Sequence, residues 1–145
     1  MDFGLEEVFK IRGFIDELNS KADSVVIVEG KRDAEALKRL GLTKHVLEFH
    51  KFGGIAKFAD SVSRHKKLII MLDSDRKGRY LTRRIIEQLS RRTKLDLSQK
   101  KRLIEITSGK IRTIEELILY EPYVNNNITL SYDQPVCPKQ KSKFT

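Results

Sequence analysis

Three acidic residues follow two predicted strands, and their types and positions fit a metal-binding site. Glu29 comes directly after the apolar run at residues 25–28, and Asp73 and Asp75 follow the apolar run at 68–72. In open parallel sheets, ligands bind at the carboxyl ends of the strands, so the three carboxylates are expected at one edge of a sheet. Clustered carboxylates raise one another's pKa unless a cation neutralises them, and Mg²⁺ prefers such oxygen ligands. The pattern therefore predicts that Glu29, Asp73 and Asp75 bind Mg²⁺, with Mn²⁺ as an alternative ion.

Each of these acidic residues also has a simpler explanation. A Glu-Gly pair after a strand is common, aspartates collect in surface loops, and Asp75 is of a type that caps a following helix. The prediction rests on three consecutive strand–turn–helix segments, which contain in order Glu29-Gly30, Gly53-Gly54 and Asp73-x-Asp75-x-x-Gly78. Tight turns, where the lack of a side chain lets the backbone come close, are expected at Gly30, Gly53, Gly54 and Gly78.

The apolar residues around these motifs alternate between strand and helix patterns. Short apolar runs predict strands, and helical spacing predicts helices after each of them. The expected strands are at residues 25–28, 46–49 and 68–72, and the expected helices are at 33–40, 55–64 and 78–91. Three strand–helix units in a row predict an α/β fold, with a central, mainly parallel sheet and helices on both faces.

The segments on either side of this alternation are expected to be organised differently. Apolar residues near helical spacing predict an amphipathic helix at 3–19 that packs on the domain. A further helix is expected at 98–106, and the capping-box sequence at 113–116 opens a short helix that stops before Pro122. The chain is accordingly divided into an N-terminal helix, one domain and a flexible tail, at residues 1–21, 22–124 and 125–145.

The charge of the chain favours an anionic partner. Its 29 Lys and Arg residues outnumber 20 Asp and Glu residues and give a net charge of +9. Thirteen of the basic residues lie between Arg76 and Arg112, where only Glu87, Asp96 and Glu105 oppose them. Such a block can neutralise several phosphates, so nucleic acid is the expected partner. The alternative is a helix face that is merely solvated.

The remaining composition favours a cytoplasmic protein that does not enter a membrane. Cys137 is the one cysteine, which excludes an intramolecular disulfide. The longest apolar run, at 68–72, is far shorter than the roughly 20 residues that a membrane span needs. The first residues also lack the order of a secretory signal.

The two acidic motifs resemble those of a known family. Residues 25–33, Val-Val-Ile-Val-Glu-Gly-Lys-Arg-Asp, resemble the first motif of the Toprim domain, and residues 72–78, Leu-Asp-Ser-Asp-Arg-Lys-Gly, resemble its second. Topoisomerases, bacterial-type primases, overcoming-lysogenization-type nucleases, recombination-repair proteins and the maturases of 5S ribosomal RNA share this Rossmann-like domain. By size the chain is most similar to the small stand-alone Toprim proteins.

The resemblance implies a role for each matching residue. Glu29 would be the general acid/base that exchanges a proton with the attacking or leaving oxygen, and Asp73 and Asp75 would coordinate Mg²⁺. Nearby basic side chains would hold phosphates, with ordinary surface charge as the alternative. These phosphate-binding candidates are Lys31, Arg32, Lys51, Arg76, Lys77, Arg79, Arg83 and Arg84.

Two functions remain after comparison with the larger Toprim proteins. The chain lacks the strand-passage machinery of a topoisomerase, the extra catalytic half of a primase and the phosphate-binding loop of an ATPase. A Rossmann-type cofactor binder would need a Gly-x-Gly-x-x-Gly turn, which is also absent. The first function is a Mg²⁺-dependent nuclease acting on structured RNA or DNA, and the acidic residues favour it. The second is a non-catalytic nucleic-acid-binding or scaffold module within a larger complex, in which a protein partner supplies specificity.

Overall fold

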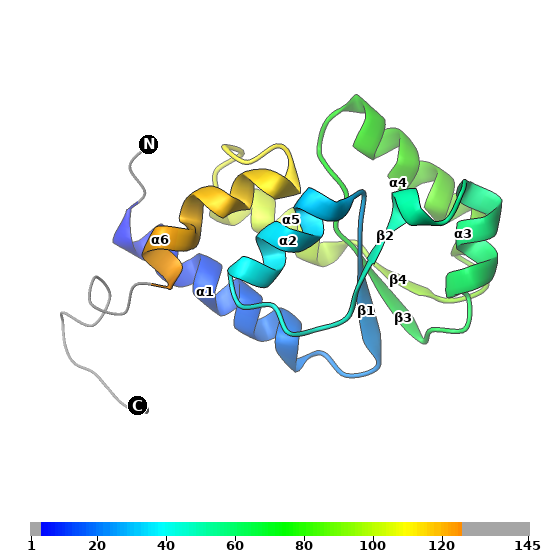
Figure 1. Ribbon diagram of the computed structural model, residues 1–145, viewed down its shortest axis with the longest axis horizontal. Helices are drawn as coiled ribbons and strands as arrows, with labels where there is room; N and C mark the ends of the chain where they lie inside the picture. Colours follow the sequence, from blue (N-terminus) through cyan, green and yellow to red (C-terminus); the bar gives the residue numbers. More distant parts are fainter. Residues whose placement is uncertain (1–3, 126–145) are drawn as a thin grey trace.

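Four parallel strands form the centre of the computed structural model, which describes residues 4–125 (Figure 1). The strands lie in the order β2-β1-β3-β4, and each neighbouring pair is parallel. Their bounds are Ser24–Val28 for β1, Val46–Glu48 for β2, Lys67–Ile70 for β3 and Lys94–Asp96 for β4. The predicted α/β fold with a parallel sheet is therefore confirmed.

The two central strands are apolar because both of their faces are covered. Successive side chains of a strand point to opposite faces. Val26 and Val28 of β1 belong to one core, and Val25 and Ile27 to the other. Strand β3 and the residues after it divide in the same way, so the near-continuous apolar runs are those of buried parallel strands.

Helices cover both faces of the sheet (Figure 1). One face carries α1 (Leu5–Ser20), α2 (Lys31–Arg39), α5 (Ser98–Ile106), the 3₁₀ helix η2 (Ile114–Tyr120) and α6 (Glu121–Val124). The other face carries α3 (Ile55–Val62) and α4 (Arg76–Leu89), with the short 3₁₀ turn η1 (Phe49–Lys51) beside them. The connections between the strands return the chain to the edge where the strands begin, so all four parallel strands end at the opposite, carboxyl edge.

Helix α1 attaches to the domain through one apolar stripe. Val8, Ile11, Phe14, Ile15 and Leu18 are all buried, and they recur every three or four residues. The stripe packs on α5 and α6. Burying each such side chain stabilises the fold by about 1.5–3 kcal/mol, so the helix predicted at 3–19 is held as part of the core.

The structure differs from the predictions at β4 and at the start of α4, and it confirms the short helix before Pro122. Strand β4 was missed because it has only three residues and the sequence Lys-Leu-Asp has no clear strand pattern. The short helix predicted after residue 113 is confirmed as η2, which ends at Tyr120, and Pro122 then lies in the first turn of α6, where its missing N–H is not needed. Helix α4 begins at Arg76, so Gly78 lies inside the helix and not before it. Apart from Asn125, the predicted tail lies outside the described residues.

Within residues 4–125, no helix combines the length and the apolar character that crossing a membrane requires.

Candidate metal centre

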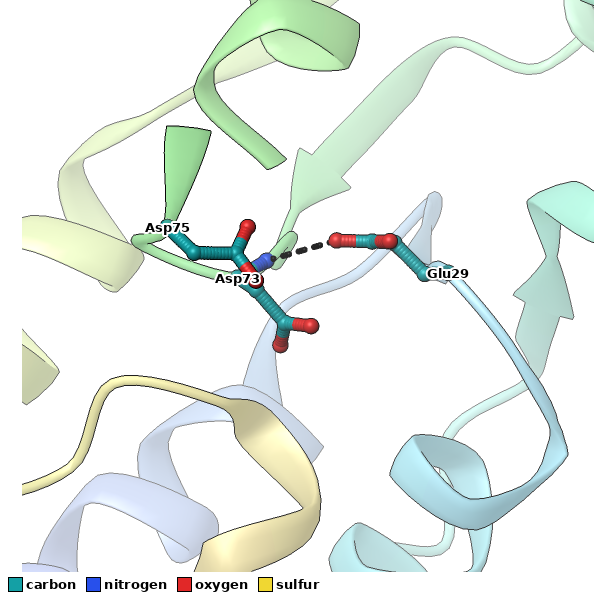
Figure 2. A group of neighbouring side chains, drawn as sticks. All are labelled: Glu29, Asp73 and Asp75. Atoms are coloured by element: carbon teal, nitrogen blue, oxygen red, sulfur yellow. Dashed lines mark hydrogen bonds between the residues drawn. The ribbon is translucent and has the colours of Figure 1, made fainter. Parts of the chain in front are cut away.

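Glu29 lies at the carboxyl end of β1 and connects it to the end of β3. Its side chain is only 6% exposed. Its Oε2 accepts a hydrogen bond from the backbone N–H of Asp73, at 3.2 Å (Figure 2). Its own carbonyl accepts a hydrogen bond from the backbone of His50, at 3.0 Å, which secures the end of β2 beside it. The carboxylate is therefore fixed at the point where three strands end.

Asp73 and Asp75 are also oriented by backbone N–H groups. Oδ1 of Asp73 accepts from Ile114 at 2.8 Å, and Oδ1 of Asp75 accepts from Gly78 at 2.8 Å. Asp75 thus has the helix-capping role considered for it, at the start of α4, but its second oxygen is not used by that bond. One ligand atom from each of Glu29, Asp73 and Asp75 lies within 4.8 Å of the others (Figure 2). The structure therefore brings the three predicted carboxylates together.

Gly78 is required for this arrangement. A Cβ atom built at this position would lie 2.1 Å from the carbonyl oxygen of Asp73, far inside van der Waals contact. The backbone of α4 therefore approaches Asp73 as closely as it does only because residue 78 has no side chain. This close approach also lets the Gly78 N–H reach the carboxylate of Asp75. Of the other expected turns, Gly53 and Gly54 both have positive φ before α3, whereas Gly30 has an extended backbone and caps α2.

The electrostatics of the cluster show an excess of negative charge. Burial and the neighbouring charge of Asp73 raise the pKa of Glu29 to about 7. Burial and the same aspartate also raise the pKa of Asp33. A set of carboxylate oxygens without nitrogen or sulfur donors suits a hard divalent cation such as Mg²⁺ or Mn²⁺. The three residues therefore fit the metal that the motifs implied.

Asp33 is a member of the site to which the sequence motifs assigned no role. It is buried, and its Oδ2 accepts from the N–H of Gly30 at 3.2 Å, while its Oδ1 accepts from Glu115 at 3.0 Å. It therefore connects the turn after Glu29 to the start of η2. The Gly-x-x-Asp spacing, in which an acidic side chain at the third helical position bonds back to the capping residue, was the signal that could have indicated it.

Lys100 is the second residue whose place was not expected. Its ammonium group donates a hydrogen bond to the carbonyl of Leu72, the residue before Asp73. Burial lowers its pKa, while the charges of Asp73 and Glu29 act in the opposite direction. The side chain reaches this position from α5, and nothing in the local sequence distinguishes Lys100 from Lys101.

The predicted phosphate-binding residues divide into two groups. Six are exposed on α2 and α4, the helices that follow the two acidic motifs: Lys31, Arg32, Arg76, Lys77, Arg79 and Arg83. Two are already in ion pairs, since Arg84 lies 3.3 Å from Glu87 and Lys51 lies 3.4 Å from Glu48. The second pair of residues is therefore less available to a ligand than the first group.

The fold and the acidic centre together define a Toprim-type protein. Residues 24–108 match the Toprim domain, which is more than half of the chain, and the protein therefore belongs to the Toprim domain family. The resemblance based on the two motifs is confirmed. The domain connects the chain with nucleic acids and with metal-dependent chemistry in general.

Relatives of similar size occur in archaea. A UPF0292 protein of Methanocaldococcus jannaschii is 36% identical over 115 residues, which cover 77% of this chain and 89% of that protein. A UPF0292 protein of Archaeoglobus fulgidus is 33% identical over 106 residues, covering 71% of this chain and 82% of the relative. Among solved structures, a protein from Aquifex aeolicus is similar with a TM-score of 0.60 and 25% identity, over 72% of this chain and 94% of that one.

Proposed function

We propose that this protein is a metal-dependent nuclease that cleaves phosphodiester bonds in structured RNA or DNA. The observation that supports it most is the convergence of Glu29, Asp73 and Asp75 at one edge of the sheet. A protein that only bound phosphates would gain nothing from three carboxylates beside its basic surface, because they repel the same anion. A divalent cation held there reverses that repulsion.

The proposed roles follow from the position of each side chain. Asp73 and Asp75 hold Mg²⁺ or Mn²⁺, with Glu29 close enough to share the ion. The bound ion supplies positive charge for the phosphate and for the charge that develops on it in the transition state. Glu29 exchanges a proton with the attacking or leaving oxygen, a role for which its fixed position at the centre of the cluster is suited.

Basic residues on two helices complete the proposed site. Lys31 and Arg32 lie in the first turn of α2, and Arg76 and Lys77 lie in the first turn of α4. All four are exposed, and the two helices start next to Glu29 and Asp75 respectively. We assign them the phosphates on either side of the cleaved bond, which they hold by charge and hydrogen bonding.

The proposal is tested by cleavage of a panel of labelled structured RNAs and DNAs, with Mg²⁺, with Mn²⁺ and with a chelator. We expect metal-dependent cleavage by the unmodified protein and its loss in Glu29→Gln and Asp73→Asn. Glu35→Gln is the matched control, because Glu35 is exposed on α2 and its ion pair is with Arg39, at 3.9 Å. If the unmodified protein and all variants bind nucleic acid tightly but none cleaves it, the nuclease proposal is contradicted and the non-catalytic binding module is favoured.

A further inference from the structure

A groove of about 530 Å³ lies between α4 and α5 and reaches the acidic centre. Asp73 and Ser74 line one part of it, so the groove and the candidate metal centre share a residue. Its size falls within the range of roughly 300–1,000 Å³ that is usual for small-molecule sites. Its apolar residues are Ile70, Leu72, Ile86, Leu97 and Ile104. Ile70 and Leu72 are buried, so the accessible apolar surface comes mainly from Leu97 and Ile104, which are 40% and 37% exposed.

The groove exists because β4 covers only part of β3. The last paired residues of these strands are Ile69 and Asp96. After Asp96 the chain turns into α5, so Ile70, the last residue of β3, has no partner in β4. Ile70 and Leu72 border the groove on this side as buried residues, next to the exposed Leu97 and Ile104. The apolar surface is a consequence of the topology and lies directly beside the acidic centre.

Basic side chains surround this apolar surface. Arg79 and Arg83 of α4 and Lys101 of α5 line the groove, and all three are exposed. Within residues 4–125 none of the three forms an ion pair, whereas Arg92 and Arg102 of the same basic block lie 3.1 Å and 2.7 Å from Asp60 and Glu17. The groove therefore combines an apolar surface with cations that carboxylates do not neutralise.

We propose that this groove binds an unpaired nucleotide of the substrate strand, next to the bond positioned at the acidic centre. The base lies against the apolar surface, and the phosphates lie at Arg79, Arg83 and Lys101. An aliphatic surface can cover the apolar face of a base, and the cations beside it can neutralise phosphates, so the groove matches the two parts of a nucleotide. A base inside a duplex cannot present its face, so the groove selects loops and strand ends. The inference rests on the proposed function, since it names the class of substrate for the same site.

The first test measures binding without cleavage. The probes are labelled single strands of about eight nucleotides, as RNA and as DNA, each with all its bases or with abasic positions, and a chelator is present throughout. The unmodified protein is expected to bind the intact strand about tenfold more tightly than the abasic one. The double variant Leu97→Ser/Ile104→Ser should bind both strands equally.

This variant has a matched control. Leu97 and Ile104 are 40% and 37% exposed, so their replacement changes the core little, and circular dichroism checks the fold. Leu119 is 45% exposed on η2, outside the groove, and Leu119→Ser should keep the preference for the intact strand. Equal binding of intact and abasic strands by the unmodified protein would overturn the inference. A mononucleotide that competes as well as the whole strand would also overturn it, because the groove would then serve a free nucleotide.

The second test measures the phosphate interactions. Log affinity for the single strand should fall linearly with log salt, and Arg83→Ala should reduce the slope by about 0.7, because the variant neutralises one phosphate fewer. Lys66→Ala should leave the slope unchanged, since Lys66 is 80% exposed at the opposite end of β3. Equal salt dependence of binding in Arg83→Ala and Lys66→Ala would contradict the proposal that Arg83 holds a phosphate in the groove. Neither test involves cleavage, so the two proposals can be contradicted separately. Nucleotide binding by the groove can be absent while cleavage is observed, and cleavage can be absent while nucleotide binding is observed.

Discussion

At the scale of single residues, the candidate centre depends on backbone groups as much as on side chains. Glu29, Asp73 and Asp75 each accept a hydrogen bond from a backbone N–H, and these bonds orient the three carboxylates. The presence of the acids at strand ends could be predicted from the sequence, because the order of the chain places strand ends at one edge. The bond from Glu115 to Asp33 and the bond from Lys100 to Leu72 could not, because these partners are 82 and 28 residues apart along the chain.

Gly78 provides the sharpest test at this scale. We expect Gly78→Ala to lower the free energy of unfolding by about 1–3 kcal/mol, because the new Cβ atom would lie 2.1 Å from the carbonyl oxygen of Asp73. The backbone must shift to relieve this clash, so Mg²⁺ affinity should fall as well. Urea denaturation and calorimetric metal titration measure the two effects.

Gly13→Ala is the control for this substitution. Gly13 is exposed in the interior of α1, and a Cβ atom there would have no other heavy atom within 4 Å. Alanine suits a helix interior better than glycine, so this variant should gain about 0.5–1 kcal/mol of stability. If the free energy of unfolding changed in the same direction in Gly78→Ala and Gly13→Ala, the steric explanation for Gly78 would be contradicted.

At the scale of elements, η2 supports the site although it comes late in the chain. Its first N–H groups donate to Asp73 and Asp33, through Ile114 and Glu115. The capping box at its start was visible in the sequence and is confirmed, with Glu116 accepting from Arg112 and Thr113 at 2.8 Å and 2.9 Å. Its packing against α2 was not visible, because an apolar pattern shows which face is buried and not which partner covers it.

The capping box predicts a pH dependence of stability. The hydrogen bond from the backbone of Thr113 holds the pKa of Glu116 below its usual value. A carboxyl with a depressed pKa in the folded state stabilises the fold above its unfolded pKa, and this contribution is lost as pH falls through the folded pKa. We therefore expect Glu116→Gln to cost about 1 kcal/mol at neutral pH and nothing at a pH well below the folded pKa. Urea denaturation at several pH values measures the difference.

Glu115→Gln is the matched control for that variant. Glu115 also lies in the first turn of η2 and has the same favourable position relative to the helix dipole, but its side chain is exposed. It should lose less stability than Glu116→Gln at neutral pH, because only Glu116 accepts the two backbone bonds. An equal loss in both variants would mean that the helix dipole, and not the capping box, is responsible.

At the scale of the whole molecule, topology brings distant segments to one edge of the sheet. Three strand–helix units could be recognised from apolar runs and turn residues, and they placed Glu29, Asp73 and Asp75 correctly. The groove could not be predicted, because it follows from the shortness of β4, a strand of three residues with a weak pattern. The groove places apolar and basic side chains beside the acidic centre, so the strand that was missed in the sequence borders the surface for which we propose nucleotide binding.

The last prediction concerns the whole fold, because an ion that binds only the folded state stabilises all of it. At a Mg²⁺ concentration ten times its dissociation constant, the gain is about 1.4 kcal/mol, which raises Tm by roughly 5 °C in a domain of this size. Differential scanning calorimetry with and without Mg²⁺ measures the shift, and Asp73→Asn should abolish it. Asp60→Asn is the control, since Asp60 is 78% exposed, pairs with Arg92 and is not a member of the acidic centre. A Tm that rises equally in Asp73→Asn would mean that the ion binds elsewhere.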